Sequence, residues 1–221
     1  MIGIIGAMQK ELNYLLSLLT DKETKEIYGF SFYQGKLKNK EVVIVKCGIG
    51  KVNASIVTSL LINNFHPSFI INTGVAGGVD ANPYDIVVGT KFIYNDFSMK
   101  HIDGTETGVC PGLPLYLTST DSLVNKAKEI FKDEVKYGLI TTGDRFQISK
   151  KDISDILIHN PLAVDCESTS IAHTCYLLKT DFIIIRGISD KLDHQGQIND
   201  YNSFAETVAE KCSNFILKMI E

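Results

Sequence analysis

The chain has 221 residues, of which 44% are hydrophobic and 22% are charged, and its formal net charge is −4. This length suits a single domain, residues 1–221, with a sizeable core, and the composition is that of a soluble globular protein. A mildly acidic chain without runs of Lys or Arg has no electrostatic attraction for nucleic acid. No apolar stretch approaches the ~20 residues that span a bilayer, so neither nucleic acid nor a membrane is an expected partner.

The N-terminus and the cysteines indicate a cytoplasmic protein. The segment Met1–Gly6 is apolar but has no basic residues before it and turns polar at Gln9, unlike a signal peptide. The five cysteines are irregularly spaced and include no C-x-x-C, which is typical of free thiols in a reducing compartment. No two Cys or His residues stand at ligand spacing, so no metal site is predicted.

In the first third of the chain, short apolar runs alternate with helical periodicity. Ile2–Ala7 predicts a buried strand, and leucines between positions 12 and 19 predict a helix. Two runs, 31–37 and 41–47, predict a hairpin, because only Lys38-Asn39-Lys40 separates them. A helix over about 52–61 and a buried strand over 69–72 follow.

The same alternation continues to the C-terminus after one interruption. A strand is predicted over 86–93, and a Gly- and Pro-containing irregular stretch over 95–117 is long enough to indicate a functional or interface loop. The remaining predicted elements are, in order, a helix over 123–131, strands over 137–141 and 163–164, a helix over 167–178, a strand over 182–188 and a helix over 204–219. Alternating strands and helices predict an α/β fold with a largely parallel sheet covered on both faces.

In open α/β sheets, ligands bind beyond the carboxyl ends of the strands, so the residues that follow each strand are the candidates for a site. They include glycines for close backbone approach, several carboxylates, one Arg and one Phe. The segments are Gly6–Glu11, Gly48–Lys51, Asn72–Gly78, Gly143–Phe146, Asp165–Glu167 and Arg186–Asp190.

Each candidate also has a simpler interpretation. Glu11 could serve the dipole of its own helix, Asp190 could be a helix cap or turn residue, and Cys166 could pack in the core. Arg186 is different, because a charge within the apolar run Phe182–Ile188 needs a carboxylate partner. Neither early glycine pair fits the dinucleotide pattern G-x-G-x-x-G.

Five segments in a fixed order carry a family resemblance: Gly3–Met8 with Glu11, Gly48–Ala54, Ile71–Gly74, Gly143-Asp144 and Arg186–Asp190. Together they resemble the 5′-methylthioadenosine/S-adenosylhomocysteine nucleosidases, a branch of the nucleoside phosphorylase superfamily. The resemblance covers nearly the whole chain. It implies a three-layer α/β/α fold with a twisted, mostly parallel mixed sheet, a homodimer that uses no cofactor or metal, and a small-molecule adenine nucleoside as substrate.

The resemblance also implies catalytic roles. Asp190 would protonate N7 of adenine while Ser189 holds it, and Glu11 would activate the attacking water that Arg186 orients. Protonation makes the base a neutral leaving group, so that the C1′–N9 bond can break towards an oxocarbenium-like sugar. A carboxylic acid can do this near neutral pH if burial raises its pKa.

The remaining site residues would bind substrate. Phe146 would stack on the base, the backbone near Gln147 would read its edge, and Glu167 would hold the ribose hydroxyls. The residues expected to line the rest of the sugar and 5′ region are Met8, Ile49, Val75, Gly77, Asp165, Cys166 and Tyr201.

Three departures from the family pattern concern the substrate site. Val75 stands where Ser is common in a T-G-S-A-G-G run, which weakens a phosphorylase interpretation, and Asp165-Cys166-Glu167 replaces Glu-Met-Glu. Tyr94-Asn95-Asp96-Phe97 replaces a Tyr-His-Asp-based run, which leaves the 5′ specificity open. The alternatives are a related purine nucleosidase with a different 5′ preference, a phosphorylase, and a non-catalytic nucleoside-binding paralogue.

Overall fold

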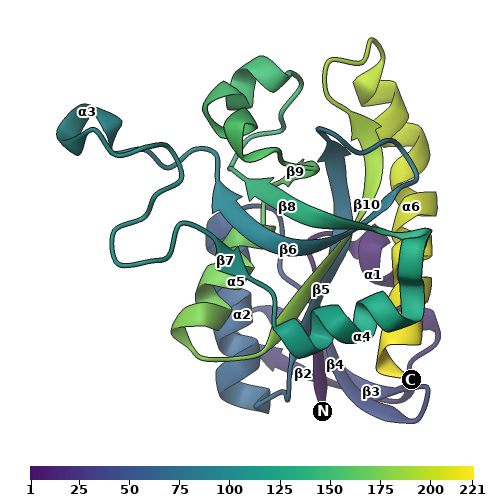
Figure 1. Cartoon of the computed structure of the whole chain (residues 1–221). Helices are drawn as coiled ribbons and strands as arrows, with labels where there is room; N and C mark the ends of the chain where they lie inside the picture. Colours follow the sequence, from purple (N-terminus) through teal and green to yellow (C-terminus); the bar gives the residue numbers. More distant parts are fainter.

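The computed structural model describes residues 1–221, and its centre is a ten-stranded sheet with helices on both faces (Figure 1). The strands are β1 (Ile2–Gly6), β2 (Thr20–Ile27), β3 (Phe30–Leu37), β4 (Lys40–Lys46), β5 (Ile70–Gly78), β6 (Ile86–Tyr94), β7 (Leu117–Thr118), β8 (Lys136–Thr142), β9 (Ala163–Asp165) and β10 (Phe182–Lys191). The α-helices are α1 (Gln9–Ser17), α2 (Lys51–Phe65), α3 (Lys100–Asp103), α4 (Asp121–Phe131), α5 (Ser168–Leu177) and α6 (Gln197–Ile220). Two 3₁₀ segments, Lys132–Glu134 and Lys150–His159, complete the fold.

The sheet has the order β10-β6-β8-β9-β5-β1-β4-β3-β2, with β7 beside β6. Parallel pairs join β4, β1, β5 and β10, and also β6, β8 and β9, whereas β2–β3–β4, β10–β6, β5–β9 and β6–β7 are antiparallel. Because β10 pairs with both β5 and β6, the strands β5, β9, β8, β6 and β10 close into a ring. The sheet is therefore open only on the side that ends in β2.

Two cores lie on opposite faces of the sheet, as a three-layer fold requires. Helices α2 and α5 cover one face, where 23 buried residues cluster, and α1, α4 and α6 cover the other, where 22 cluster. Alternate residues of β4 enter the two cores: Val43 and Val45 one, Val42 and Ile44 the other. Such strands are apolar throughout because both faces are buried, and the expected α/β/α fold is confirmed.

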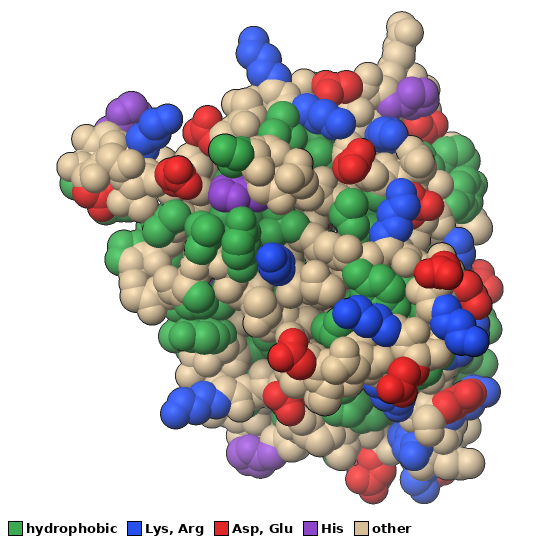
Figure 2. Space-filling view, viewed as in Figure 1, with side chains coloured by type: hydrophobic (Ala, Val, Ile, Leu, Met, Phe, Trp, Pro, Cys, Tyr) green, Lys and Arg blue, Asp and Glu red, His purple; other side chains and the backbone are tan.

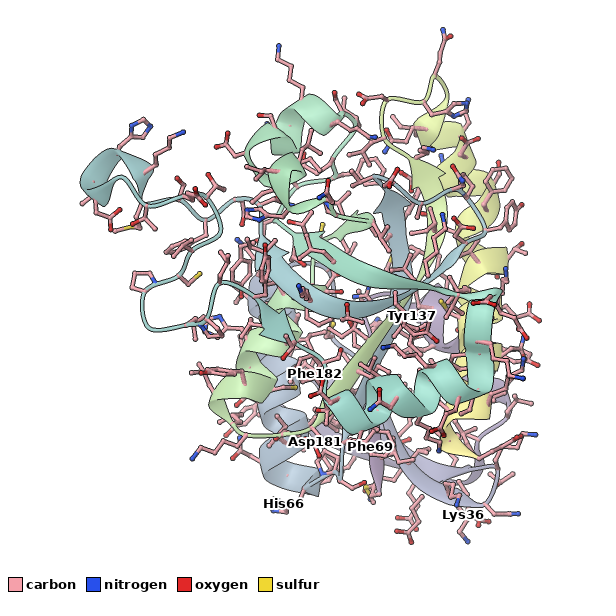
Figure 3. The ribbon with its side chains drawn as sticks, viewed as in Figure 1. Lys36, His66, Phe69, Tyr137, Asp181 and Phe182 are labelled. Atoms are coloured by element: carbon pink, nitrogen blue, oxygen red, sulfur yellow. The ribbon has the colours of Figure 1, made fainter.

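The two ends of the sheet differ in chemistry. Phe69 and Phe182 mark the starts of β5 and β10, where Ile70 donates a backbone hydrogen bond of 2.9 Å to Asp181 (Figure 3). The carboxyl ends of the same strands, at the opposite end of the sheet, carry Gly77, Ser189 and Asp190. The polar segments found in the sequence therefore gather at the end of the sheet where these strands finish.

The structure adds elements that the sequence pattern did not predict. Strand β2, with the sequence TDKETKEI, is exposed almost throughout and pairs only with β3. Such a polar edge strand has no apolar alternation to reveal it. The irregular stretch 95–117 contains only the short helix α3 and projects from the body (Figure 1). None of the helices is both long and apolar enough to cross a membrane.

Candidate active site

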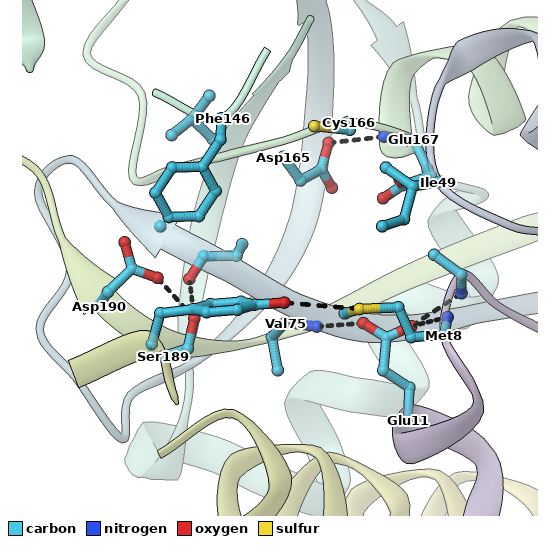
Figure 4. A pocket seen from close by; sticks show the side chains of 15 residues that line it. Met8, Glu11, Ile49, Val75, Phe146, Asp165, Cys166, Glu167, Ser189 and Asp190 are labelled. Atoms are coloured by element: carbon cyan, nitrogen blue, oxygen red, sulfur yellow. Dashed lines mark hydrogen bonds between the residues drawn. The ribbon is translucent and has the colours of Figure 1, made fainter. Parts of the chain in front are cut away.

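A pocket opens at the carboxyl ends of β1, β5, β9 and β10, beside the first turns of α6 (Figure 4). Every predicted site residue lines it except Arg186 and Gln147. The lining residues are Ala7, Met8, Glu11, Ile49, Val75, Ala76, Gly77, Phe146, Val164, Asp165, Cys166, Glu167, Ser189, Asp190 and Tyr201.

A β-bulge explains how Ser189 and Asp190 both reach the pocket. Side chains alternate between faces along a regular strand, so consecutive residues normally point apart. The pairing of β10 with β5 shifts register between Ile188 and Asp190, which leaves Ser189 as the extra residue. A bulge re-aims the side chains next to it, and here the two neighbouring polar side chains face the same cavity.

Asp190 is buried but is held only by neutral groups. Its exposed fraction is 1%, and its carboxylate accepts hydrogen bonds from Ser189 Oγ to Oδ1 (2.6 Å) and from Gln197 Nε2 to Oδ2 (2.7 Å). Burial raises the pKa of Asp190, and the two hydrogen bonds oppose that rise. Asp190 lies within β10, so it does not cap a helix, and that simpler interpretation is wrong.

Gln197 is a contact of the acid that the sequence gave no reason to select. It is the first residue of α6, and its side-chain nitrogen also donates to the backbone carbonyl of Gln147 at 2.9 Å. Gln147 itself is buried outside the pocket lining. The hydrogen bond between Gln197 and Gln147 joins residues 50 positions apart, and no spacing pattern in the sequence indicates it.

Two aromatic rings meet in the wall of the pocket. Phe146 and Tyr201 lie edge to face with centroids 5.5 Å apart, and Phe146 is 49% exposed. The Tyr201 hydroxyl lies 3.5 Å from Met8 Sδ and accepts a hydrogen bond from Lys10 Nζ at 3.2 Å. Phe146 thus presents a free face to the pocket, while Tyr201 bridges towards α1.

Glu11 is buried on the opposite side of the pocket, where three backbone N–H groups hold it. Oε2 accepts from Ala7 and Met8, both at 2.8 Å, and Oε1 accepts from Val75 at 3.0 Å. Burial raises the pKa of Glu11, while Arg186 and the backbone donors lower it. Two of these donors, Ala7 and Met8, lie at the start of α1. Glu11 therefore also stabilises the N-terminus of its own helix, which was the simpler interpretation of this residue.

Arg186 lies behind the pocket and is 1% exposed. Asp165 supplies the carboxylate partner that a buried Arg requires: Nε donates to Asp165 Oδ2 at 2.8 Å, and Nη2 donates to Asn72 Oδ1 at 2.6 Å. Nη1 has no protein partner. This free donor adjoins Gly74, and Glu11 Oε1 adjoins the same glycine.

Glu167 completes a group of three carboxylates around Arg186, with Oε2 4.0 Å from Nη2. Its Oε1 accepts from the backbone N–H of Gly50 at 3.0 Å, which brings the loop before α2, and with it Ile49, to the pocket. Burial, helped by the negative charge of Asp165, raises the pKa of Glu167 to about 7. Asp165 also accepts hydrogen bonds from Thr142 and Ser168, so it is fully engaged.

Two of the departures from the family pattern have different surroundings. Val75 packs against Ala205, Val208 and Ala209 of α6, so its side chain extends the core while its N–H serves Glu11. Cys166 is partly exposed in the pocket, with Sγ 3.8 Å from the Arg145 carbonyl, so the interpretation of Cys166 as core packing is wrong.

Comparison with known proteins assigns the chain to a family. Residues 1–221 match the model of the phosphorylase superfamily. A curated 5′-methylthioadenosine/S-adenosylhomocysteine nucleosidase from Exiguobacterium is 39% identical over 224 residues, which cover 98% of this chain and 95% of that protein.

Solved structures agree over the full length. The nucleosidase of the same name from Neisseria meningitidis, in complex with methylthio-immucillin-A, has a TM-score of 0.92 at 32% identity and covers 99% of this chain and 97% of its own. Futalosine hydrolase of Helicobacter pylori has a TM-score of 0.92 at 27% identity, with 99% and 96% covered. The chain therefore belongs to the phosphorylase superfamily.

Proposed function

We propose that the protein hydrolyses the N-glycosidic bond of 5′-methylthioadenosine and S-adenosylhomocysteine and releases adenine. The name of the relative that is 39% identical over almost the entire chain supports this substrate class. The observation that carries the proposal is Asp190, a carboxyl group 1% exposed at the pocket wall and bonded only to Ser189 and Gln197. A buried acid without a cation is suited to donate a proton near neutral pH.

On the base side, Asp190 gives its proton to N7 as the C1′–N9 bond breaks. The leaving group is then neutral adenine instead of its anion. Phe146 stacks on the ring, and the backbone of Gln147 reads its edge. The exposed face of Phe146 and the tie between Gln147 and Gln197 support this placement.

On the sugar side, Glu167 and Glu11 face the carbon that gains positive charge. Glu167 holds the ribose hydroxyls, and Glu11 accepts a proton from the attacking water. Arg186 Nη1 is a buried donor without a protein partner, and it orients that water. Attack from the face opposite the base inverts the configuration, as in the inverting class of two-carboxylate glycoside hydrolases.

Phosphorolysis fits the site less well than hydrolysis. Arg186 is the only buried cation at the pocket, and it is committed to Asp165 and Asn72. The carboxylates of Glu11 and Glu167 lie beside it, so a phosphate dianion would meet more negative than positive charge. The retained Glu11, Arg186 and Asp190 also favour an enzyme over a non-catalytic binding paralogue.

The preference at the 5′ position is a separate part of the proposal. Met8 and Ile49 lie on the side of the pocket opposite Asp190 (Figure 4), where a thioether would lie, and the Tyr201 hydroxyl reaches Met8 Sδ at 3.5 Å. Cys166 lines the same pocket. The structural likeness to a protein named futalosine hydrolase supports keeping a different 5′ group in view. A related nucleosidase with shifted 5′ preference therefore stays the alternative.

We further propose a cytoplasmic homodimer of single-domain subunits that needs no cofactor. Hydrophobic side chains gather below the projecting 95–117 loop (Figure 2), where Phe97, Pro111 and Leu113 line a groove together with Leu177. Leu177 of α5 is 60% exposed and Val52 of α2 is 68% exposed. An apolar face of this kind is typical of a subunit interface, and light scattering after size exclusion tests it.

One assay tests the activity. The protein is incubated with methylthioadenosine, S-adenosylhomocysteine, adenosine and inosine, with and without phosphate, and base release is followed. Hydrolysis of the first two without phosphate is expected. A requirement for phosphate would identify a phosphorylase, and binding without release would identify a non-catalytic paralogue.

A further inference from the structure

The segment that carries the acid is tied to the segment that carries the stacking ring. Asp193, just after β10, donates its backbone N–H to the Ile148 carbonyl at 3.0 Å and accepts from Ser149 Oγ at 2.6 Å. Gln197 adds a third tie through its bond to the Gln147 carbonyl. Residues 146–150 and 190–197 therefore form one hydrogen-bonded unit on the base side of the pocket.

Among these ties, only the side chain of Gln197 reaches the acid. Its Nε2 lies 2.7 Å from Asp190 Oδ2 and 2.9 Å from Gln147 O, so one amide nitrogen bridges both acceptors. The side chain is fixed at both ends: it is buried, and its own backbone N–H donates to His194 O at 3.1 Å. Gly196, at φ 104°, makes the turn that starts α6 at this residue.

We propose that Gln197 is a positioning residue that sets the orientation of the Asp190 carboxyl group relative to the base-binding segment. This inference rests on the function proposed above. Ser189 holds only Oδ1, so a carboxyl group without Gln197 can rotate about its bond to Cβ. With Gln197 in place, both oxygens are fixed and the acid moves together with Gln147 and Phe146. A donor misplaced relative to N7 loses rate steeply, because proton transfer depends on geometry first.

The amide also affects the proton affinity of the acid. An N–H donor stabilises the ionised form, so Gln197 opposes the rise that burial causes in the pKa of Asp190. Removing the donor should therefore raise this pKa. Asp200, in the same first part of α6, is the charged neighbour that raises the pKa of Asp190, and it is unchanged in the variants below.

The test compares Gln197→Met with Gln195→Met. Met fills a similar volume but cannot donate, and Gln195 is an exposed residue of the same loop. With methylthioadenosine, we expect Gln197→Met to lower kcat about tenfold, the effect of losing one hydrogen bond that orients the acid. KM should change less, and the alkaline limb of the kcat–pH profile should move to higher pH. Gln195→Met should match the wild type in all three.

Wild-type turnover measured in parallel separates this inference from the proposed function, since an inactive wild type would reject the function itself. With an active wild type, an unchanged kcat and pH profile in a folded Gln197→Met variant would overturn the positioning role. Tighter adenine binding by that variant would overturn it too, because Gln197 would then compete with the base. Gln197→Glu gives an independent check: its carboxylate cannot donate when ionised, so kcat should fall and the alkaline limb should again move upward.

Discussion

The base side and the sugar side of the pocket bury carboxylates in opposite ways. On the base side, Asp190 stands without a cation and accepts hydrogen bonds from a hydroxyl and an amide. On the sugar side, Glu11, Asp165 and Glu167 surround one guanidinium group, that of Arg186. Burial raises carboxyl pKa values on both sides, but only on the base side does a single carboxyl group stand without a cation beside it.

The comparison teaches that the surroundings divide the labour between chemically similar groups. An isolated buried acid is a proton donor, whereas carboxylates gathered about a cation create a negative region that favours a positively charged sugar. Each prediction below alters one side and asks whether the other is spared.

Asp190→Asn should have the largest effect. It keeps the shape but removes the proton, so kcat for methylthioadenosine should fall by about 10²–10⁴, the usual contribution of a general acid. Adenine binding, measured by calorimetry, should change little. Asp80→Asn, at an exposed position, is the control. Near-normal turnover would reject the acid role.

Arg186→Met should destabilise the folded protein through the sugar side of the pocket. Asp165 would lose its partner within the buried network, and breaking a buried ion pair costs about 3–5 kcal/mol. The free energy of unfolding, from urea titration, should fall by about that amount. Lys36→Met removes an exposed pair with Asp21 and should cost far less. An equal fall in the free energy of unfolding of both variants would mean that the buried Arg186 network contributes no more to stability than an exposed ion pair.

Glu167→Gln should change how stability depends on pH. The folded-state pKa of about 7 lies above the ordinary glutamate value of 4.5, so Glu167 stabilises the fold below pH 4.5, and this contribution is lost as pH rises through 7. The variant has no such loss. Its free energy of unfolding relative to wild type should therefore rise between pH 4.5 and 8, by on the order of 3 kcal/mol. A difference that stays constant with pH would show that Glu167 is ionised throughout.

Tyr201→Phe should have the smallest effect. It removes the hydroxyl contacts to Lys10 and Met8 but keeps the ring against Phe146. We expect KM for methylthioadenosine to change less than about fivefold with kcat intact, because the bond from Lys10 is only partly buried and a typical hydrogen bond contributes about 1 kcal/mol. A large fall in kcat would give the hydroxyl a part in the chemistry.

The sequence predicted those parts of the fold whose hydrophobic pattern is local. The strands β1, β4, β6 and β10 could be predicted from their apolar runs, because both faces of these strands are buried. Strand β5 was predicted only as far as Asn72, since Thr73–Gly78 has the composition of a loop. It is held as a strand by pairing with β9 and β10, and that pairing depends on the tertiary fold.

The same distinction applies to the candidate site. Residues at or shortly beyond the carboxyl end of a strand, such as Asp190 in β10 and Glu11 after β1, follow from the rule that ligands bind at these ends. Arg186 was marked by its charge within an apolar run. Gln197 was missed, because its role depends on how α6 packs against β10, and a polar residue at the start of a helix is unremarkable in sequence.

The most direct test of this division of labour uses a leaving group that needs no proton. Asp190→Asn and Glu11→Gln are assayed on methylthioadenosine and on the matching 4-nitrophenyl 5-methylthioriboside. The 4-nitrophenolate of this second substrate leaves without being protonated. We predict that Asp190→Asn loses about 10²–10⁴ in kcat on the nucleoside but stays within a few-fold of wild type on the nitrophenyl substrate, whereas Glu11→Gln is impaired on both. Equal losses of Asp190→Asn on both substrates would contradict the assignment of Asp190 as the acid that lets the base leave.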